Sequence, residues 1–131
     1  MQGIDLPTVE ELNLAGNSIE YLEGLEKMIH LKRLIMPKNL LSDTDNLLFM
    51  KTKSLEFADF SYNRIPMSYI DKLAEIVRFL SNLKDIYLTG NEITISKYYK
   101  VKLADIRNLE RIDGAEISSY IKKELDVTLL N

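Results

Sequence analysis

The sequence predicts an α/β solenoid, in which short parallel strands stack side by side and helical segments return the chain behind them. Two observations support this fold class: one spacing of apolar residues followed by asparagine recurs four times, and the copies follow one another at similar intervals. The four copies are Val9-Leu12-Leu14-Asn17, Leu31-Leu34-Met36-Asn39, Leu55-Ala58-Phe60-Asn63 and Leu83-Ile86-Leu88-Asn91. A partial fifth copy begins at Leu109-Ile112 and ends at Asp113-Gly114.

Each copy predicts one strand of the sheet. In the first copy, alternation directs Leu12 and Leu14 toward the core. Glu11, Asn13 and Ala15 then lie on the opposite face. An asparagine amide carries two donors and an acceptor, so the column of asparagines can pair loop backbone groups that would otherwise be buried without partners.

The return segments lengthen along the chain, because the steps between asparagines are 22 residues (17 to 39), 24 (39 to 63) and 28 (63 to 91). The shortest return has room for a 3-10 turn, and the longest accommodates an α-helix. Residues 68–71 resemble a capping box that follows Pro66, and residues 42–45 predict a similar helix start. Helical spacing in the longest return defines one apolar face: Ile70, Leu73, Ala74, Val77 and Leu80.

This recurring pattern resembles that of the leucine-rich repeat. The resemblance implies a right-handed superhelix with a parallel sheet on the concave face and helices and 3-10 turns on the convex face. We expect one domain over residues 1–131, with repeats at about 9–30, 31–54, 55–82 and 83–108, a C-terminal cap at about 98–118 and a C-terminal helix or tail at 118–131. Ser118 or Ser119 is expected to cap a helix that shields the last repeat, and a tail awaiting a partner is the alternative.

The segment after the fourth repeat resembles the C-terminal cap of a subset of intracellular eukaryotic leucine-rich repeat proteins. Tyr98 corresponds to the cap tyrosine, Leu109 to its second leucine and residues 112–114 to its closing triplet. Tyr99 and Arg107 depart from the pattern. With this cap, the chain resembles small intracellular leucine-rich repeat proteins, the group of the dynein leucine-rich light chain, the spliceosomal A-prime protein, the acidic nuclear phosphoproteins and the phosphatase-1 regulatory subunit. That resemblance implies an adaptor that grips another protein with its concave sheet.

The composition is that of an ordinary globular domain. Apolar residues make up 46% of the chain and charged residues 28%, with a formal net charge of −3, so no overall basic field indicates nucleic acid. Cysteine is absent, whereas extracellular repeat proteins of this kind usually carry disulfide-stapled caps. No signal peptide or membrane-spanning run is recognisable. We therefore expect an intracellular protein, cytoplasmic or nuclear with the cytoplasm or cytoskeleton preferred. The resemblance of the C-terminal cap implies a eukaryotic source.

Outward positions of the predicted strands supply the candidate partner-binding residues. Because neighbouring strands lie about 4.8 Å apart, Ile35, Phe57 and Tyr87 form a diagonal apolar stripe across the sheet. Charged residues surround it: Arg33, Asp59, Asp85 and Arg111. An apolar stripe with a charged rim is typical of a protein-binding hot spot. Two alternatives stay open, namely that these side chains only pack on one another, or that a partner binds the convex side or the terminal edge.

Other patterns give weaker functional signals. Residues 42–46 resemble the start of a calcium loop but lack its later glycine and glutamate, so a helix start is favoured. His30 is the single histidine, which leaves no pair of residues for a metal site or a catalytic base. Gly16 and Gly90 each precede an asparagine of the column and serve turns. We therefore expect no enzymatic activity, no cofactor and no metal.

Basic and aromatic residues gather near the predicted cap: Lys97, Tyr98, Tyr99, Lys100, Lys102, Arg107 and Arg111. Surfaces that stack nucleic-acid bases mix these residue types. Asp105, Glu110 and Asp113 dilute the positive charge, and the cap itself accounts for Tyr98. Direct nucleic-acid binding is therefore disfavoured relative to a protein partner that itself carries RNA.

Taken together, these patterns predict a non-catalytic protein–protein interaction module, a scaffold or adaptor whose concave sheet binds a partner protein. The alternatives are a regulatory subunit of an enzyme such as a phosphatase or motor ATPase, and a component of an RNA–protein complex. No membrane contact is expected. We expect a monomer, with an edge-to-edge dimer through the first strand as the alternative, because only Ile4, Leu6 and the pair Glu10-Glu11 guard that edge.

Overall fold

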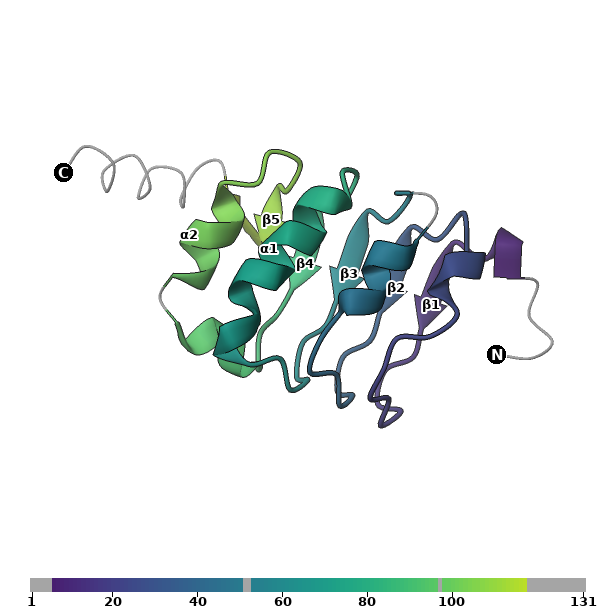
Figure 1. Cartoon of the computed structure of the whole chain (residues 1–131), viewed down its shortest axis with the longest axis horizontal. Helices are drawn as coiled ribbons and strands as arrows, with labels where there is room; N and C mark the ends of the chain where they lie inside the picture. Colours follow the sequence, from purple (N-terminus) through teal and green to yellow (C-terminus); the bar gives the residue numbers. More distant parts are fainter. Residues whose placement is uncertain (1–5, 51–52, 97, 118–131) are drawn as a thin grey trace.

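A computed structural model describes residues 6–50, 53–96 and 98–117 of the chain. These residues form a six-stranded sheet whose strand order follows the chain, with the helical segments gathered on one face (Figure 1). The strands are β1 (Glu11–Asn13), β2 (Arg33–Ile35), β3 (Phe57–Asp59), β4 (Asp85–Tyr87), β5 (Arg111–Ile112) and β6 (Ala115–Glu116). The predicted α/β solenoid is therefore confirmed.

The first five strands are parallel, and their register pairs equivalent positions of successive repeats. Leu12 lies beside Leu34, and the same column continues through Ala58, Ile86 and Ile112. The sixth strand is an addition to the expected parallel sheet, because β6 runs antiparallel to β5. Asp113 and Gly114 join the two strands with φ angles of 53° and 84°, the positive pair that tight hairpin turns require.

The returns confirm the expected lengthening over the first three repeats. Their elements are η1 (Leu6–Thr8), η2 (Leu25–Lys27), η3 (Asp45–Phe49), η4 (Met67–Tyr69) continuing into α1 (Ile70–Phe79), and then η5 (Glu92–Ile95) and α2 (Tyr99–Ala104). The fourth return does not continue the trend, because its helical residues are divided between η5 and α2. Leu73, Ala74 and Val77 face the core as the helical spacing predicts.

The predicted capping box at residues 68–71 is wrong. Pro66 is extended, and Tyr69 N–H donates to the Pro66 carbonyl at 3.1 Å, so a 3-10 turn leads into α1. Ser68 lies inside that turn and makes no capping bond to α1. The chain therefore enters its longest helix through a turn fixed by proline.

The predicted column of asparagines forms a ladder of hydrogen bonds between repeats. The Asn39 amide oxygen accepts from the backbone N–H groups of Asn17 and Ile19, both at 2.9 Å. The Asn63 amide oxygen accepts from Leu41 N–H and that of Asn91 from Ile65 N–H, both at 3.0 Å, and all three ladder asparagines after the first are buried. Each amide thus reaches back to the repeat before it. No repeat precedes Asn17 among the described residues, and Asn17 is exposed.

The C-terminal cap closes the ladder with a carboxylate. Asp113 Oδ1 accepts from the backbone N–H groups of Leu88 (2.7 Å) and Thr89 (3.0 Å). The Tyr99 hydroxyl donates to Asp113 Oδ2 at 2.5 Å. Tyr99 is 6% exposed and Tyr98 is 64% exposed, so the assignment of Tyr98 as the cap tyrosine is wrong by one position.

The predicted C-terminal helix or tail at residues 118–131 lies outside the described residues, which end at Ile117.

Within the described residues, no helix is long and apolar enough to cross a membrane.

Candidate protein-binding surface

The face of the sheet opposite the helices, which we call the open face, carries two rows of side chains. The register places Glu11, Arg33, Phe57, Asp85 and Arg111 in one row. The second row holds Asn13, Ile35, Asp59 and Tyr87. All seven residues predicted to bind a partner therefore lie on one face, at positions that successive strands bring next to one another.

The centre of the open face is a stack of a cation and two aromatic rings. The Arg33 guanidinium carbon lies 4.0 Å above the centre of the Phe57 ring. The Phe57 and Tyr87 ring centres are 5.6 Å apart with their planes tilted by 47°. Both geometries are favourable, because the ring face attracts a cation and tilted rings avoid face-to-face repulsion. The three side chains therefore hold one another in place before any partner arrives.

The C-terminal end of the open face carries a forked ion pair. Arg111 donates from Nε to Asp85 Oδ1 at 2.5 Å and from one terminal nitrogen to Oδ2 at 2.9 Å. These hydrogen bonds raise the pKa of Arg111 above its already high usual value. A bidentate ion pair of this kind fixes the orientation of both side chains in addition to the attraction between their charges.

At the N-terminal end of the open face, Arg33 has a second contact that the site prediction did not include. Its Nε donates to Glu11 Oε1 at 2.9 Å, so this guanidinium bridges a carboxylate and an aromatic ring. The alternation of the strands had placed Glu11 on this face. The register pairs Glu11 with Arg33, and only the structure shows that their side chains are in contact.

The remaining predicted residues contribute shape more than exposed charge. Asp59 accepts from the Ser61 backbone N–H (2.9 Å) and hydroxyl (2.6 Å), which uses one carboxylate oxygen in a local turn. Ile35 is half-buried beside it. Ile35, Phe57 and Tyr87 alternate between the two rows, so the predicted diagonal is a zigzag in which Phe57 and Tyr87 make a ring contact.

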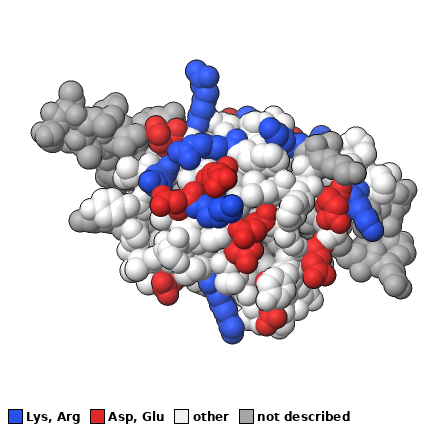
Figure 2. All heavy atoms as spheres, viewed as in Figure 1, with Lys and Arg blue, Asp and Glu red and all other residues white. Residues whose placement is uncertain are grey.

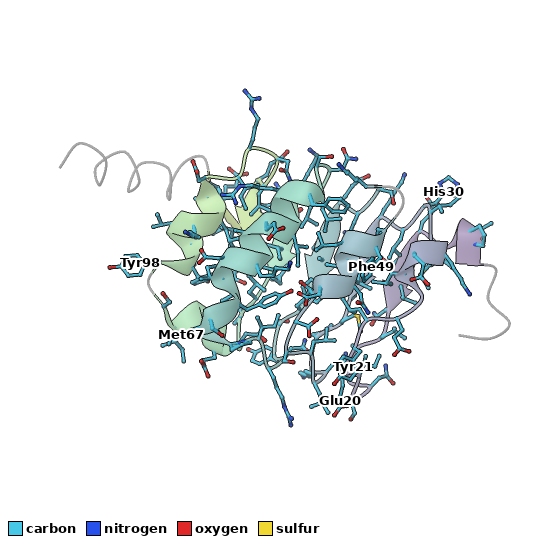
Figure 3. The ribbon with its side chains drawn as sticks, in the orientation of Figure 1. Glu20, Tyr21, His30, Phe49, Met67 and Tyr98 are labelled. Atoms are coloured by element: carbon cyan, nitrogen blue, oxygen red, sulfur yellow. The ribbon has the colours of Figure 1, made fainter. Side chains whose placement is uncertain are left out.

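The other sequence signals fall into structural roles. His30 lies in an exposed turn near the N-terminal end of the molecule (Figure 3). Thr44 is buried, and its backbone N–H donates to the Tyr69 hydroxyl at 2.9 Å. That hydroxyl in turn donates to Asp45. Burial is the larger cause that raises the pKa of Tyr69, and the hydrogen bond to Asp45 is the second. The predicted helix start at residues 42–45 is thus a 3-10 helix that begins at Asp45 without a side-chain capping bond, and Thr44 and Asp45 tie it to η4. No group of three metal-ligating side chains occurs among the described residues.

The basic cluster near the cap is divided by the fold. Lys102 pairs with Asp71 at 3.0 Å, whereas Arg111 pairs with Asp85 on the open face at 2.5 Å. Because Tyr99 is buried and Tyr98 is exposed, the two tyrosines share no common stacking surface. The geometry gives no continuous track of cations and rings among the described residues of this region.

Comparisons with known proteins agree with this fold. No protein-family model matches the sequence. The Saccharomyces cerevisiae protein PAC2 is 30% identical over 92 residues, which are 70% of this chain. The matched region spans 17% of the length of PAC2. In the crystal structure of the Drosophila melanogaster SNF/U2A′ complex, a chain superposes with a TM-score of 0.77 and 18% identity, covering 93% of this chain and 69% of that chain. The architecture, the ladder and this similarity together establish that the chain has the leucine-rich repeat fold.

Proposed function

We propose that this domain is a protein-interaction module that binds a partner on the open, concave face of its sheet. The observation that carries the proposal is the stack of Arg33, Phe57 and Tyr87, which presents ring surface at the middle of that face. Arginine and tyrosine are enriched among residues that dominate binding energy. Because neighbouring side chains already fix this stack, a partner loses little free energy in ordering it.

The charged residues on either side give the surface a direction. Glu11 and Arg33 lie toward the N-terminal end of the row, and Asp85 and Arg111 toward the C-terminal end. Pairs of opposite charge at two places favour one orientation of a partner over its reverse. The structural neighbour comes from a complex of SNF with U2A′, and this supports a protein as the partner class. The absence of cysteine from the sequence supports an intracellular setting for the interaction.

Affinity capture with paired variants tests the proposal. The parent chain and a Phe57→Asp/Tyr87→Asp variant are immobilised and exposed to the same native extract, after circular dichroism shows that both are folded. Ile95→Asp is the matched control, because Ile95 is an apolar side chain that is 75% exposed on η5, away from the open face. We expect a protein retained by the parent and the control and lost by the double variant.

Equal capture by all three chains would contradict binding on the open face. Arg33→Glu provides a second test. It reverses a charge at an exposed position, whereas Phe57→Asp and Tyr87→Asp place carboxylates where half-buried rings were. It should weaken capture and make the remaining binding less dependent on salt. If a captured partner is an enzyme whose turnover the domain changes, the regulatory-subunit alternative is supported over a passive adaptor.

A further inference from the structure

The N-terminal end of the solenoid contains an apolar hollow of about 550 Å³. Apolar side chains from β1, the segment that follows it, η2 and the residue after β2 line it: Leu12, Leu14, Ile19, Leu22, Leu25 and Met36. Leu14 and Ile19 are only half-buried, whereas their counterparts in the third repeat, Phe60 and Ile65, are 0% exposed. The hollow therefore lies where an additional layer of side chains would complete the core.

A second hollow of about 520 Å³ lies against the same segment and extends the first one. It is lined by Glu23, Gly24, Glu26, Asn46 and Phe49, and the first three of these also line the first hollow. Phe49 is 66% exposed and Tyr21, at the other hollow, is 63% exposed. Figure 3 shows both rings over the N-terminal half of the molecule. We call the two hollows together the N-terminal groove.

Acidic side chains outnumber basic ones in the lining of the N-terminal groove, because Glu23 and Glu26 line both hollows and Lys27 lines the first. From residue 6 to residue 31 the chain carries five glutamates and one lysine. Glu10 pairs with Lys32 at 3.5 Å and Glu11 with Arg33 at 2.9 Å. Within the described residues, no ion pair engages the other three glutamates, which are Glu20, Glu23 and Glu26. On the face seen in Figure 2, acidic side chains lie over the N-terminal repeats, while lysines and arginines are more numerous toward the C-terminal elements.

We propose that the N-terminal groove docks a basic amphipathic helix of a partner protein. The apolar stripe of such a helix would enter the hollows beside Tyr21 and Phe49. Its flanking Lys or Arg side chains would lie against Glu23 and Glu26, which line both hollows. A groove that spans two adjoining hollows suits a segment with several anchors better than a single small molecule. The surface is distinct from the open face of the sheet and does not depend on it.

Charge complementarity excludes the other occupants. A symmetric dimer through this end would place the same acidic patch of both copies face to face, and like charges oppose such a contact. Residues 1–5 of the chain contain no lysine or arginine. In residues 118–131, Lys122 and Lys123 are offset by Glu124 and Asp126. None of these segments supplies the net positive charge that the groove complements.

Fluorescence anisotropy with a designed peptide tests this assignment. The probe is a labelled helix of about 18 leucines and lysines, with leucine at positions i, i+3, i+4 and i+7 so that one face is apolar. Two control peptides have glutamate in place of lysine, or the same composition in scrambled order. We expect binding of the first peptide alone, and an affinity at least about tenfold lower for Glu23→Lys/Glu26→Lys.

The matched control is Glu75→Lys/Asp105→Lys, which also reverses two exposed carboxylates, one on α1 and one at the end of α2, and leaves the groove intact. Equal loss of affinity in this control would show that the peptide follows net charge, which overturns the proposal. Binding that survives Glu23→Lys/Glu26→Lys but is lost in Phe57→Asp/Tyr87→Asp would assign the peptide to the open face. A dimer in sedimentation experiments that Glu23→Lys/Glu26→Lys strengthens would make a second copy the occupant.

Methyl spectra locate the site independently of affinity. Addition of the Leu/Lys peptide should shift the methyl signals of Leu22 and Leu25, which line the groove, more than those of Leu83, which is buried in the fourth repeat. Uniform shifts across the domain, or none at Leu22 and Leu25, would contradict docking in the groove.

Discussion

The two ends of this solenoid are built differently although the repeats between them are nearly alike. At the C-terminal end, Asp113 completes the hydrogen bonds of the last full repeat and Tyr99 fixes that carboxylate. At the N-terminal end, Leu12 is 8% exposed, Leu14 is half-buried and Asn17 is exposed. The comparison shows that a repeat is stabilised mainly by the repeat that follows it, because each ladder side chain reaches backward. The first repeat receives this support but offers its own apolar side to solvent or to a partner.

The largest difference between the ends should appear in the ladder itself. Asn91→Ala removes an amide whose oxygen accepts from Ile65 N–H and whose nitrogen donates to the Phe60 and Leu88 carbonyls. We expect a loss of about 3 kcal/mol in the free energy of unfolding, because buried backbone groups lose their partners. Asn17→Ala, the matched change at the exposed end, should cost less than about 0.5 kcal/mol. Urea denaturation followed by circular dichroism measures both, and equal losses would contradict the backward-reaching ladder.

The turns that precede the ladder asparagines offer a second comparison. Gly90 has a φ of 82°, and an added Cβ would lie 2.3 Å from Cδ1 of the Tyr62 ring. Gly16 has a φ of 67° with open space around it. Gly90→Ala should therefore destabilise the domain by about 2 kcal/mol, and Gly16→Ala by about 1 kcal/mol, which is the backbone strain alone. Thermal unfolding of the two variants separates strain from crowding. A Gly90→Ala/Tyr62→Ala double variant should recover the difference.

The hydroxyl of Tyr99 provides a smaller test that is specific to the capped end. Tyr99→Phe should lower the free energy of unfolding by about 1.5 kcal/mol, the contribution of a hydrogen bond to a charged group. Tyr98→Phe is the control and should have a smaller effect, because that ring is 64% exposed. Equal losses of stability in the two variants would contradict the assignment of Tyr99 as the cap tyrosine.

The same hydroxyl makes stability depend on alkaline pH. Burial and the bond to Asp113 raise the pKa of Tyr99, so the folded state favours the neutral phenol. The contribution of this hydroxyl to the free energy of unfolding is therefore complete below about pH 10, the pKa of tyrosine in the unfolded chain. It declines as the pH rises above that value. Tyr69 behaves in the same way. Unfolding measured from pH 8 to 11 should show a shallower decline in Tyr99→Phe than in the parent chain.

The smallest expected difference concerns the ion pairs at the two ends of the open face. Asp85 and Arg111 share two hydrogen bonds, whereas Glu11 and Arg33 share one. Double-mutant cycles with alanine should give a larger coupling energy for the first pair. The coupling of both pairs should fall as salt is added, because both are solvent-accessible. A larger coupling at the N-terminal pair would contradict the geometry.

The repeat spacing is enough to predict the strands, the core columns and the ladder. Fixed offsets from each asparagine decide which side chains alternate inward, and parallel stacking then aligns equivalent positions such as Leu34 and Ala58. The same reasoning places Phe57 and Tyr87 on one face. It does not place Arg33 over Phe57, because that contact depends on the direction a long side chain takes among several rotamers.

The repeat spacing does not predict the cap tyrosine or the N-terminal groove, which depend on the orientation of a helix and on the packing of two turns. The choice between Tyr98 and Tyr99 follows the phase of α2, in which Tyr99 and Leu103 are four residues apart and both buried. That i, i+4 relation is visible in the sequence and would have identified the cap tyrosine. The N-terminal groove has no comparable signal, because its shape arises from how η2 and η3 lie against each other.

The backward reach of the ladder has a consequence for synthesis on the ribosome. Asn39 supplies hydrogen-bond partners to Asn17 and Ile19, and Asn63 does the same for Leu41. A growing chain therefore cannot complete any repeat until the next asparagine has been added, and the last full repeat waits for Asp113. At about 5 to 20 residues per second, this delay lasts a few seconds at each step. During that interval the newest unfinished repeat is the part of the nascent chain that a chaperone would have to protect.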